Sequence, residues 1–109
     1  MPHLPTLSHG QFAVLGVLMG GTVSGRDIRK RLIQFGVRQG GPAFYQSMAR
    51  LEDADLVQGW YEQQIVKAQI IRERHYRITA VGRRAWNGTR QFYARAGGML
   101  PRSKGPAYG

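Results

Sequence analysis

The sequence predicts a mainly α-helical domain that carries a small two-stranded antiparallel sheet. Two serines each precede a run of apolar residues at helical spacing, and a proline opens a third such run. β-branched and aromatic residues then dominate residues 56–78, and a further helical pattern follows them. At 109 residues the chain has the size of one domain with a single hydrophobic core.

The first helix is predicted to begin at Ser8. The Ser8 hydroxyl can accept a hydrogen bond from the third helical residue, Gln11, whose side chain can bond back to complete a capping box. Leu7 and Phe12 flank this start and can pack against each other. Apolar residues continue at helical spacing until Gly20 and Gly21, which predict the end of the helix.

The second helix is predicted to begin at Ser24, where the same arrangement recurs. Asp27 occupies the third helical position, and its carboxylate suits the positive end of a helix. Val23 and Ile28 form the flanking apolar pair, and Gly36 predicts the end of the helix.

A third helix is predicted to start at Pro42, because proline lacks the N–H that a first helical residue would leave unpaired. Phe44, Met48 and Leu51 recur at helical spacing and predict the buried side. The opposite face is predicted to be slim and polar, and it carries Ala43, Gln46, Ala49 and Arg50.

Two strands and a fourth helix are predicted after this point. The alternation of Tyr76 and Ile78 with His75 and Arg77 indicates a strand, and the turn before it is expected near residues 66–69. Thr79 is a predicted cap for a last helix that runs to about residue 96. Residues 1–96 are therefore expected to form one domain, and residues 97–109 a disordered basic tail.

The charge balance predicts a polyanionic partner. The chain has 16 Lys plus Arg against 6 Asp plus Glu, which gives a formal net charge of +10. Arginine dominates the basic set, and its planar guanidinium binds phosphates and guanine edges in pairs of hydrogen bonds. We therefore expect nucleic acid, and double-stranded DNA first, as the partner.

Composition argues against several other classes of protein. The chain has no cysteine, and its three histidines lack the spacing of metal ligands, so we expect no metal site and no cofactor. No constellation of nucleophile and base or paired carboxylates predicts an enzyme. The absence of a long apolar run or a leader-like N-terminus predicts no membrane association and a cytoplasmic, nucleoid-associated location.

Three short helices, a two-stranded hairpin and a last helix follow the order of a winged helix-turn-helix. In that fold a slim third helix enters the major groove of DNA, and the hairpin, called the wing, contacts a flanking groove or the backbone. Gln46 and Arg50 are the candidates that read bases, because glutamine can pair with adenine and arginine with guanine. The full set of candidate DNA-binding residues is Arg38, Gln39, Ala43, Tyr45, Gln46, Ala49, Arg50, Lys67, Gln69, Arg72 and Arg74.

Four segments in this order resemble the PadR family of transcriptional regulators. They are residues 7–18, residues 24–32, the third helix with its Phe44–Tyr45 pair, and residues 74–79 with Gly82. Gln46 stands where the family usually has proline, and Asp55 where it usually has glycine before the hairpin. The resemblance implies a DNA-binding transcriptional regulator that acts as a repressor and forms a homodimer through the C-terminal helix.

The sequence allows two or more roles for several aromatic residues. Tyr45 either touches a phosphate or packs beside Phe44. Trp86, Phe92 and Tyr93 are the candidate dimerisation residues; Trp86 and Tyr93 could also bind a planar effector, of unknown identity, or pack against the first helix. The alternatives for the whole chain are a protein–protein adaptor and an architectural or RNA-binding protein that depends on charge alone.

Overall fold

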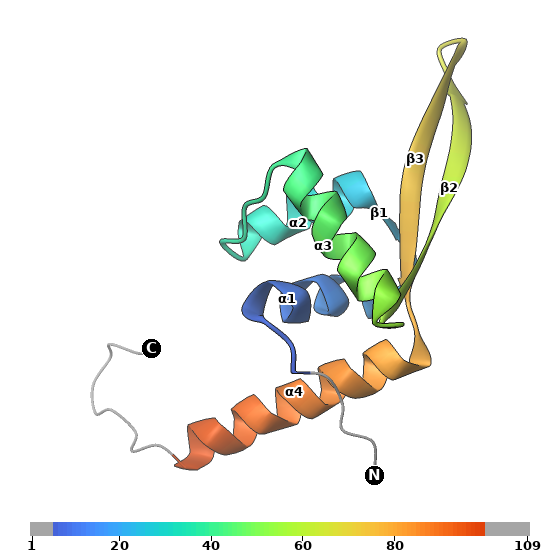
Figure 1. Ribbon diagram of the computed structural model, residues 1–109. Coiled ribbons are helices and arrows are strands. Elements are labelled where there is room, and N and C mark those ends of the chain that lie inside the picture. Colours follow the sequence, from blue (N-terminus) through green and yellow to red (C-terminus); the bar gives the residue numbers. More distant parts are fainter. Residues whose placement is uncertain (1–5, 100–109) are drawn as a thin grey trace.

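The computed structural model describes residues 6–99. Its helices and strands follow the predicted order, and one additional short strand joins the sheet (Figure 1). The elements are α1 (His9–Leu18), β1 (Val23–Ser24), α2 (Gly25–Gln34), α3 (Gly41–Asp53), β2 (Val57–Val66), β3 (Gln69–Ile78) and α4 (Ala80–Met99).

The mainly α-helical fold is as predicted, but the sheet has three antiparallel strands in the order β1-β3-β2. The prediction of two strands was wrong because β1 consists only of Val23 and Ser24, which pair with Tyr76 and His75 of β3. Two residues are too few to show the alternation by which a strand is recognised in a sequence.

The predicted helix caps are present. The Ser8 hydroxyl accepts a hydrogen bond from the Gln11 backbone at 3.1 Å, and the Gln11 side chain accepts one from the Ser8 backbone at 2.9 Å. The Ser24 hydroxyl likewise accepts from the Asp27 backbone at 3.1 Å. α3 begins one residue earlier than predicted, at Gly41, and has no side-chain cap.

One hydrophobic core joins all the elements. Leu15 of α1, Ile28 of α2, Phe44 of α3 and Tyr76 of β3 are each at most 1% exposed. The apolar residues that predicted the helix faces supply this core, so the polar face of α3 is left at the surface.

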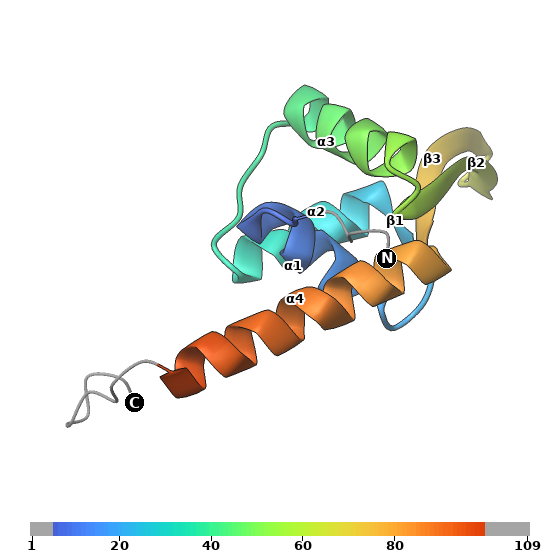
Figure 2. The same ribbon diagram turned by 60° about the horizontal axis from the view of Figure 1, so that its bottom comes forward.

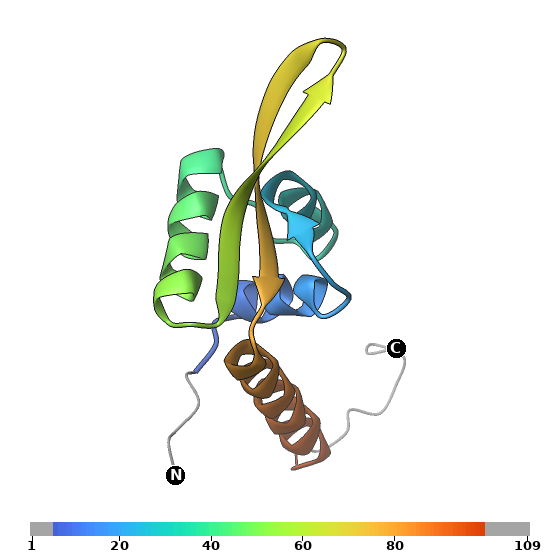
Figure 3. The same cartoon turned by 90° about the vertical axis from the view of Figure 1, so that its right-hand side faces the viewer.

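The hairpin extends far beyond this core (Figure 3). β2 and β3 pair along their full lengths, from Val57 with Ile78 to Val66 with Gln69. Lys67 and Ala68 form the two-residue turn, both with positive φ, within the predicted range. This is the left-handed backbone of a type I′ turn, whose twist matches that of the strands.

α4 lies alongside α1, and its second half extends past the rest of the described chain (Figure 2). The Thr79 hydroxyl accepts a hydrogen bond from the Gly82 backbone at 2.9 Å, as expected of a cap. The helix continues to Met99, so the predicted tail was wrong at residues 97–99, and its remaining residues lie outside the described range. Within residues 6–99, no helix has the length and apolarity needed to cross a membrane.

Candidate nucleic-acid interface

The exposed face of α3 carries the small and polar residues predicted from the sequence. Ala43, Gln46, Ala49 and Arg50 are all exposed, whereas the apolar side of the helix is buried. Gln46 lies on the side opposite Phe44, and its amide is therefore available to a ligand. Small neighbours on either side allow a close approach to a groove about 12 Å wide.

Tyr45 packs within the protein. Its ring meets Phe44 edge to face, with the ring centroids 5.0 Å apart. A Cβ at Gly25 would approach the Tyr45 hydroxyl to 2.7 Å, so any larger residue at the start of α2 would displace the Tyr45 ring. The side chain remains 39% exposed, and its main contact is the one between α2 and α3.

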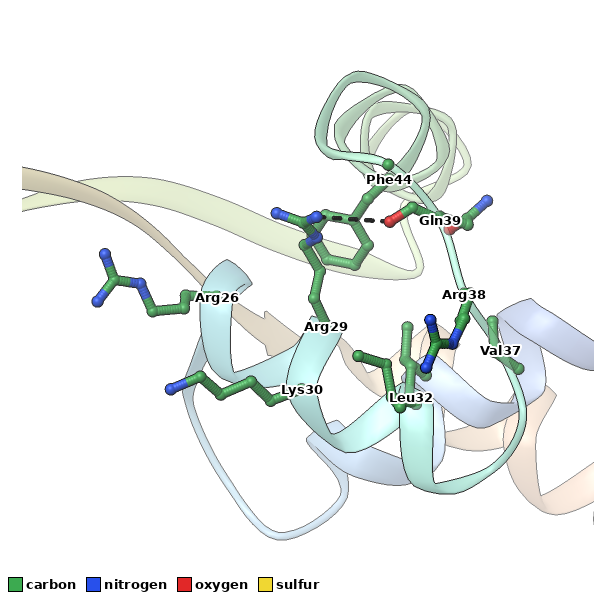
Figure 4. Close-up of a pocket in the computed structure, with 10 residues that line it drawn as sticks. Arg26, Arg29, Lys30, Leu32, Val37, Arg38, Gln39 and Phe44 are labelled. Carbon is green, nitrogen blue, oxygen red and sulfur yellow. Dashed lines mark hydrogen bonds between the residues drawn. The ribbon is translucent and has the colours of Figure 1, made fainter.

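The connector between α2 and α3 is tied to both helices. The Gln39 side-chain amide donates a hydrogen bond to the Ser47 hydroxyl at 3.2 Å, and the Gln39 carbonyl accepts a longer one, of 3.5 Å, from Arg29 (Figure 4). The Gln39 side chain therefore holds α3, and the exposed Arg38 beside it is left for a partner.

A cationic groove lies next to this connector, with a volume of about 530 Å³. Arg26, Arg29, Lys30 and Arg38 line it, and none of its lining residues is acidic (Figure 4). Arg26 is 3.9 Å from Glu73, while Arg29 Nε is buried without a hydrogen-bond partner among the described residues. The groove therefore adds a positive surface to the N-terminal end of α3.

The sequence did not predict a role in this site for Arg26, Arg29 and Lys30. Their spacing of three and four residues places them on one face of α2, and this pattern could have predicted a basic helix face. Their proximity to Arg38 depends on how the connector folds back, and that could not be read from the spacing.

The base of the hairpin is fixed to α3 by an ion pair. Arg74 donates a hydrogen bond to the Glu52 carboxylate at 2.7 Å, and both side chains are about three-quarters buried (24% and 26% exposed). The sequence predicts Arg74 as a cation for phosphate, whereas the structure pairs its guanidinium with Glu52. Arg74 therefore holds the hairpin against α3.

Burial and charge act in opposite directions at this ion pair. Partial burial opposes the charge on Arg74, but the interactions with Glu52 and Tyr76 together outweigh burial and raise the pKa of Arg74 above its ordinary value. Burial also raises the pKa of the neighbouring Tyr76 to about 12, although Arg74 acts in the opposite direction. The base of the hairpin thus holds a fixed cation beside a neutral phenol.

Gly59 permits this packing. A Cβ at Gly59 would lie 2.8 Å from both the Glu52 carboxylate and the Tyr76 ring. Tyr61 continues the same face of the hairpin, and the guanidinium groups of Arg72 and Arg74 lie over its ring at 4.5 and 4.8 Å from the centroid. The aromatic ring therefore orients Arg72, whose side chain remains exposed.

The outer hairpin carries the remaining predicted contacts at the surface. Lys67 lies in the turn, Gln69 closes it by pairing with Val66, and Arg72 follows on β3. All three predicted residues are exposed. On the opposite face of β3, His75 lies 3.2 Å from the Glu62 carboxylate. No group of acidic residues and histidines in residues 6–99 has the geometry of a metal site.

The aromatic residues of α4 separate into two sets. Trp86 stacks on Phe12 of α1 with the ring centroids 5.4 Å apart, so its ring contributes mainly to packing within the chain. Phe92 and Tyr93 remain 64% and 52% exposed, and Tyr93 also touches Phe12 edge to face. Phe92 and Tyr93 are thus the members of the predicted dimerisation set that are most available to a second molecule.

No family model and no curated protein matches the sequence. The fold, in contrast, is similar to that of solved protein structures. A transcriptional regulator from Clostridium thermocellum is similar in structure, with a TM-score of 0.66, 21% sequence identity, and coverage of 82% of this chain and 84% of that chain. A PadR family transcription regulator from Clostridium difficile R20291 has a TM-score of 0.71 and 16% identity, with coverage of 83% and 92%.

A further similar structure is Bacillus subtilis PadR, which was solved in complex with operator DNA. Its TM-score is 0.58 and its identity 20%, over 88% of this chain and 49% of that one, so this chain corresponds to about half of its length. The described part of the chain therefore has the winged helix-turn-helix fold found in PadR-family transcription regulators.

Proposed function

We propose that this chain is a DNA-binding transcriptional regulator of the PadR kind that acts in the cytoplasm as a repressor. The observation that carries the proposal is the position of two surfaces relative to each other. The polar face of α3 and the cationic outer hairpin both lie outside the core, and the hairpin tip extends beyond the N-terminal end of α3 (Figures 1 and 3). One protein of similar fold, Bacillus subtilis PadR, was solved in complex with operator DNA.

In this proposal α3 enters the major groove. Gln46 pairs with an adenine edge and Arg50 with a guanine edge, while Ala43 and Ala49 allow the close approach. The cationic groove and Arg72 neutralise phosphates, which sets affinity but not sequence. Binding at a promoter would then exclude the transcription machinery.

We further propose that two copies bind together through α4. Phe92 and Tyr93 lie in the second half of α4 and are 64% and 52% exposed. Aromatic side chains at such a position gain stability when a second copy covers them. A two-fold dimer would bind half-sites about one helical turn apart.

The experiment is selection of bound duplexes from a random pool, followed by affinity measurements on the selected sequence. Gln46→Ala and Arg50→Ala are each expected to weaken binding by about 1–3 kcal/mol and to relax preference at one base pair. Arg84→Ala is the control, because it removes an exposed cation of α4 away from α3. Unchanged preference in both α3 variants would refute the assignment.

The dimer has a separate test. Phe92→Ala is expected to shift the sedimentation coefficient from that of a dimer to that of a monomer, because it removes an exposed aromatic side chain from the proposed interface. Arg95→Ala, a substitution on the same exposed half of α4, is the control and should leave the dimer intact. A monomeric wild-type protein would refute the proposed assembly while leaving DNA binding to be judged on its own.

A further inference from the structure

The tip of the hairpin carries aliphatic side chains that no residue in the described part of the chain covers. Ile65 and Ile70 form a cross-strand pair next to the turn, and they are 80% and 70% exposed. Val66, the neighbour of Ile65, is 42% exposed. Together they make an aliphatic end on the most extended element of the molecule (Figure 1).

Folding does not require these residues at the tip. The hydrophobic core is complete without them, since it draws on the base of the hairpin through Val57, Tyr76 and Ile78. Strand propensity alone would be met equally well by threonine, which is also β-branched and leaves a hydroxyl at the surface. The aliphatic side chains at the tip therefore indicate a contact with a partner.

The charge around the tip identifies the chemistry of that partner. Residues 63–72 contain Lys67 and Arg72 and no acidic residue. Lys67 lies in the turn between the two isoleucine-bearing strands, and Arg72 lies two residues beyond Ile70. An aliphatic end enclosed by cations is complementary to an apolar surface that is flanked by anions. Stacked bases between two phosphate backbones have this arrangement.

The size of the tip also favours DNA over a protein partner. A stable protein interface buries about 800 Å² on each side. Two isoleucines and a valine at the end of a two-stranded arm offer far less than this. A single base step is of a suitable size, and inserted isoleucine side chains are a known way to open one from the minor groove.

The length of the hairpin brings the tip to a neighbouring groove. Each strand has 10 residues, and at about 3.3 Å per residue the outer part, residues 63–66 paired with residues 69–72, projects roughly 13 Å beyond the half that packs against α3. The arm extends past the N-terminal end of α3 in both side views (Figures 1 and 3). With α3 in a major groove about 12 Å wide, such an arm reaches beyond that groove to the flanking minor groove.

We propose that Ile65 and Ile70 form a wedge that enters the minor groove beside the site of α3, unstacks one base step and bends the duplex. This inference rests on the proposed DNA-binding function and adds an activity to it, the distortion of DNA. Lys67 and Arg72 would hold the two phosphate backbones on either side of the opened step. Because some base steps unstack more easily than others, the affinity would then also depend on the sequence of the step that the wedge opens.

The test uses the full chain and a duplex with the selected half-sites. A donor and an acceptor dye at the duplex ends report bending by energy transfer, and 2-aminopurine in the flanking sequence reports unstacking by increased fluorescence. The tip variant is Ile65→Thr combined with Ile70→Thr, which keeps β-branched residues in both strands. The matched control is Gln63→Thr combined with Gln64→Thr, the same substitution at two exposed polar positions of the same hairpin.

The wild-type protein and the control should bend the duplex and raise the 2-aminopurine signal. The tip variant should bind the half-site with less than about a tenfold loss of affinity, yet give the energy transfer and fluorescence of free DNA. Equal bending by the tip variant and the wild type overturns the wedge, as does a wild-type complex with sequence preference and no distortion. If the wild type binds no duplex with preference, the proposed function itself fails.

Discussion

The two halves of the hairpin belong to the same pair of strands but differ in almost every physical property. The inner half packs against α3 through Tyr76, Gly59 and the ion pair of Glu52 with Arg74. The outer half, residues 63–72, is exposed nearly throughout and combines cations with aliphatic residues. The inner half pairs Arg74 with Glu52 within the chain, whereas the outer half presents Lys67 and Arg72 at the surface.

The inner half therefore positions the hairpin, whereas the outer half is available to contact DNA. The Glu52 carboxylate offsets the charge of the Arg74 guanidinium and so weakens its attraction to a phosphate; Arg74 instead sets the angle of the hairpin relative to α3. Arg72, only two residues away, is stacked on Tyr61 and stays available. Substitutions in the inner half should therefore change stability, and substitutions in the outer half should change DNA binding.

The largest expected effect is at Tyr76, which is 1% exposed. Tyr76→Ala should lower the free energy of unfolding by about 3–5 kcal/mol, because it removes a buried aromatic ring and leaves a cavity. Ile70→Ala, an aliphatic truncation in the same strand at 70% exposure, should change it by less than about 0.5 kcal/mol. Urea denaturation measures both, and similar losses would erase the distinction between the two halves.

A smaller effect is expected at Gly59. Gly59→Ala should destabilise by about 1–3 kcal/mol, because its Cβ would lie 2.8 Å from Glu52 and Tyr76 and force them apart. Gly20→Ala is the matched control, since a Cβ there meets nothing within 4 Å. If thermal unfolding shows the two variants equally stable, the close packing at the base does not limit stability.

The two arginines should differ in the salt dependence of DNA binding. Arg72→Gln should reduce the slope of log affinity against log salt concentration by about 1, the value for one lost phosphate contact. Arg74→Gln should reduce it by clearly less, because the native guanidinium is already paired with Glu52 at 2.7 Å. Fluorescence anisotropy titrations at several salt concentrations give the slopes. A larger reduction for Arg74→Gln would reverse the assignment.

The smallest effect is expected in the turn. Ala68 has a φ of 63°, a conformation that glycine adopts without a steric penalty. Ala68→Gly should raise the free energy of unfolding by about 0.5 kcal/mol and leave the charge of the tip unchanged. Chemical denaturation measures the difference, and Ala54→Gly, at an exposed alanine with a φ of −82°, is the matched control and should gain no stability. A loss of stability would contradict the positive φ at this turn.

Local signals in the sequence predicted most of the fold. Ser8 and Ser24 each act on a backbone N–H three residues away, so the caps are complete within one helical turn. The burial of Tyr76 and Ile78 likewise follows from alternation along a single strand. Asp55, which replaces the glycine usual in PadR-like sequences, has a φ of 61°, which gives the physical reason for that glycine.

Features that depend on distant parts of the chain were not predictable in this way. Glu52 and Arg74 are 22 residues apart, and their pairing requires the hairpin to fold back along α3. The pairing of β1 with β3 rests on two residues. For the candidate site, the exposed face of α3 followed from helical spacing, whereas the grouping of Arg26, Arg29 and Lys30 with Arg38 required the path of the connector.

Methylation protection of a bound duplex by dimethyl sulfate tests the central claim most directly. The reagent modifies guanine N7, which lies in the major groove, and adenine N3, which lies in the minor groove. With α3 in the major groove and the outer hairpin beside it, guanine N7 should be protected within each half-site and adenine N3 in the flanking sequence. A tight complex in which guanine N7 stays fully reactive would contradict the placement of Gln46 and Arg50 against bases.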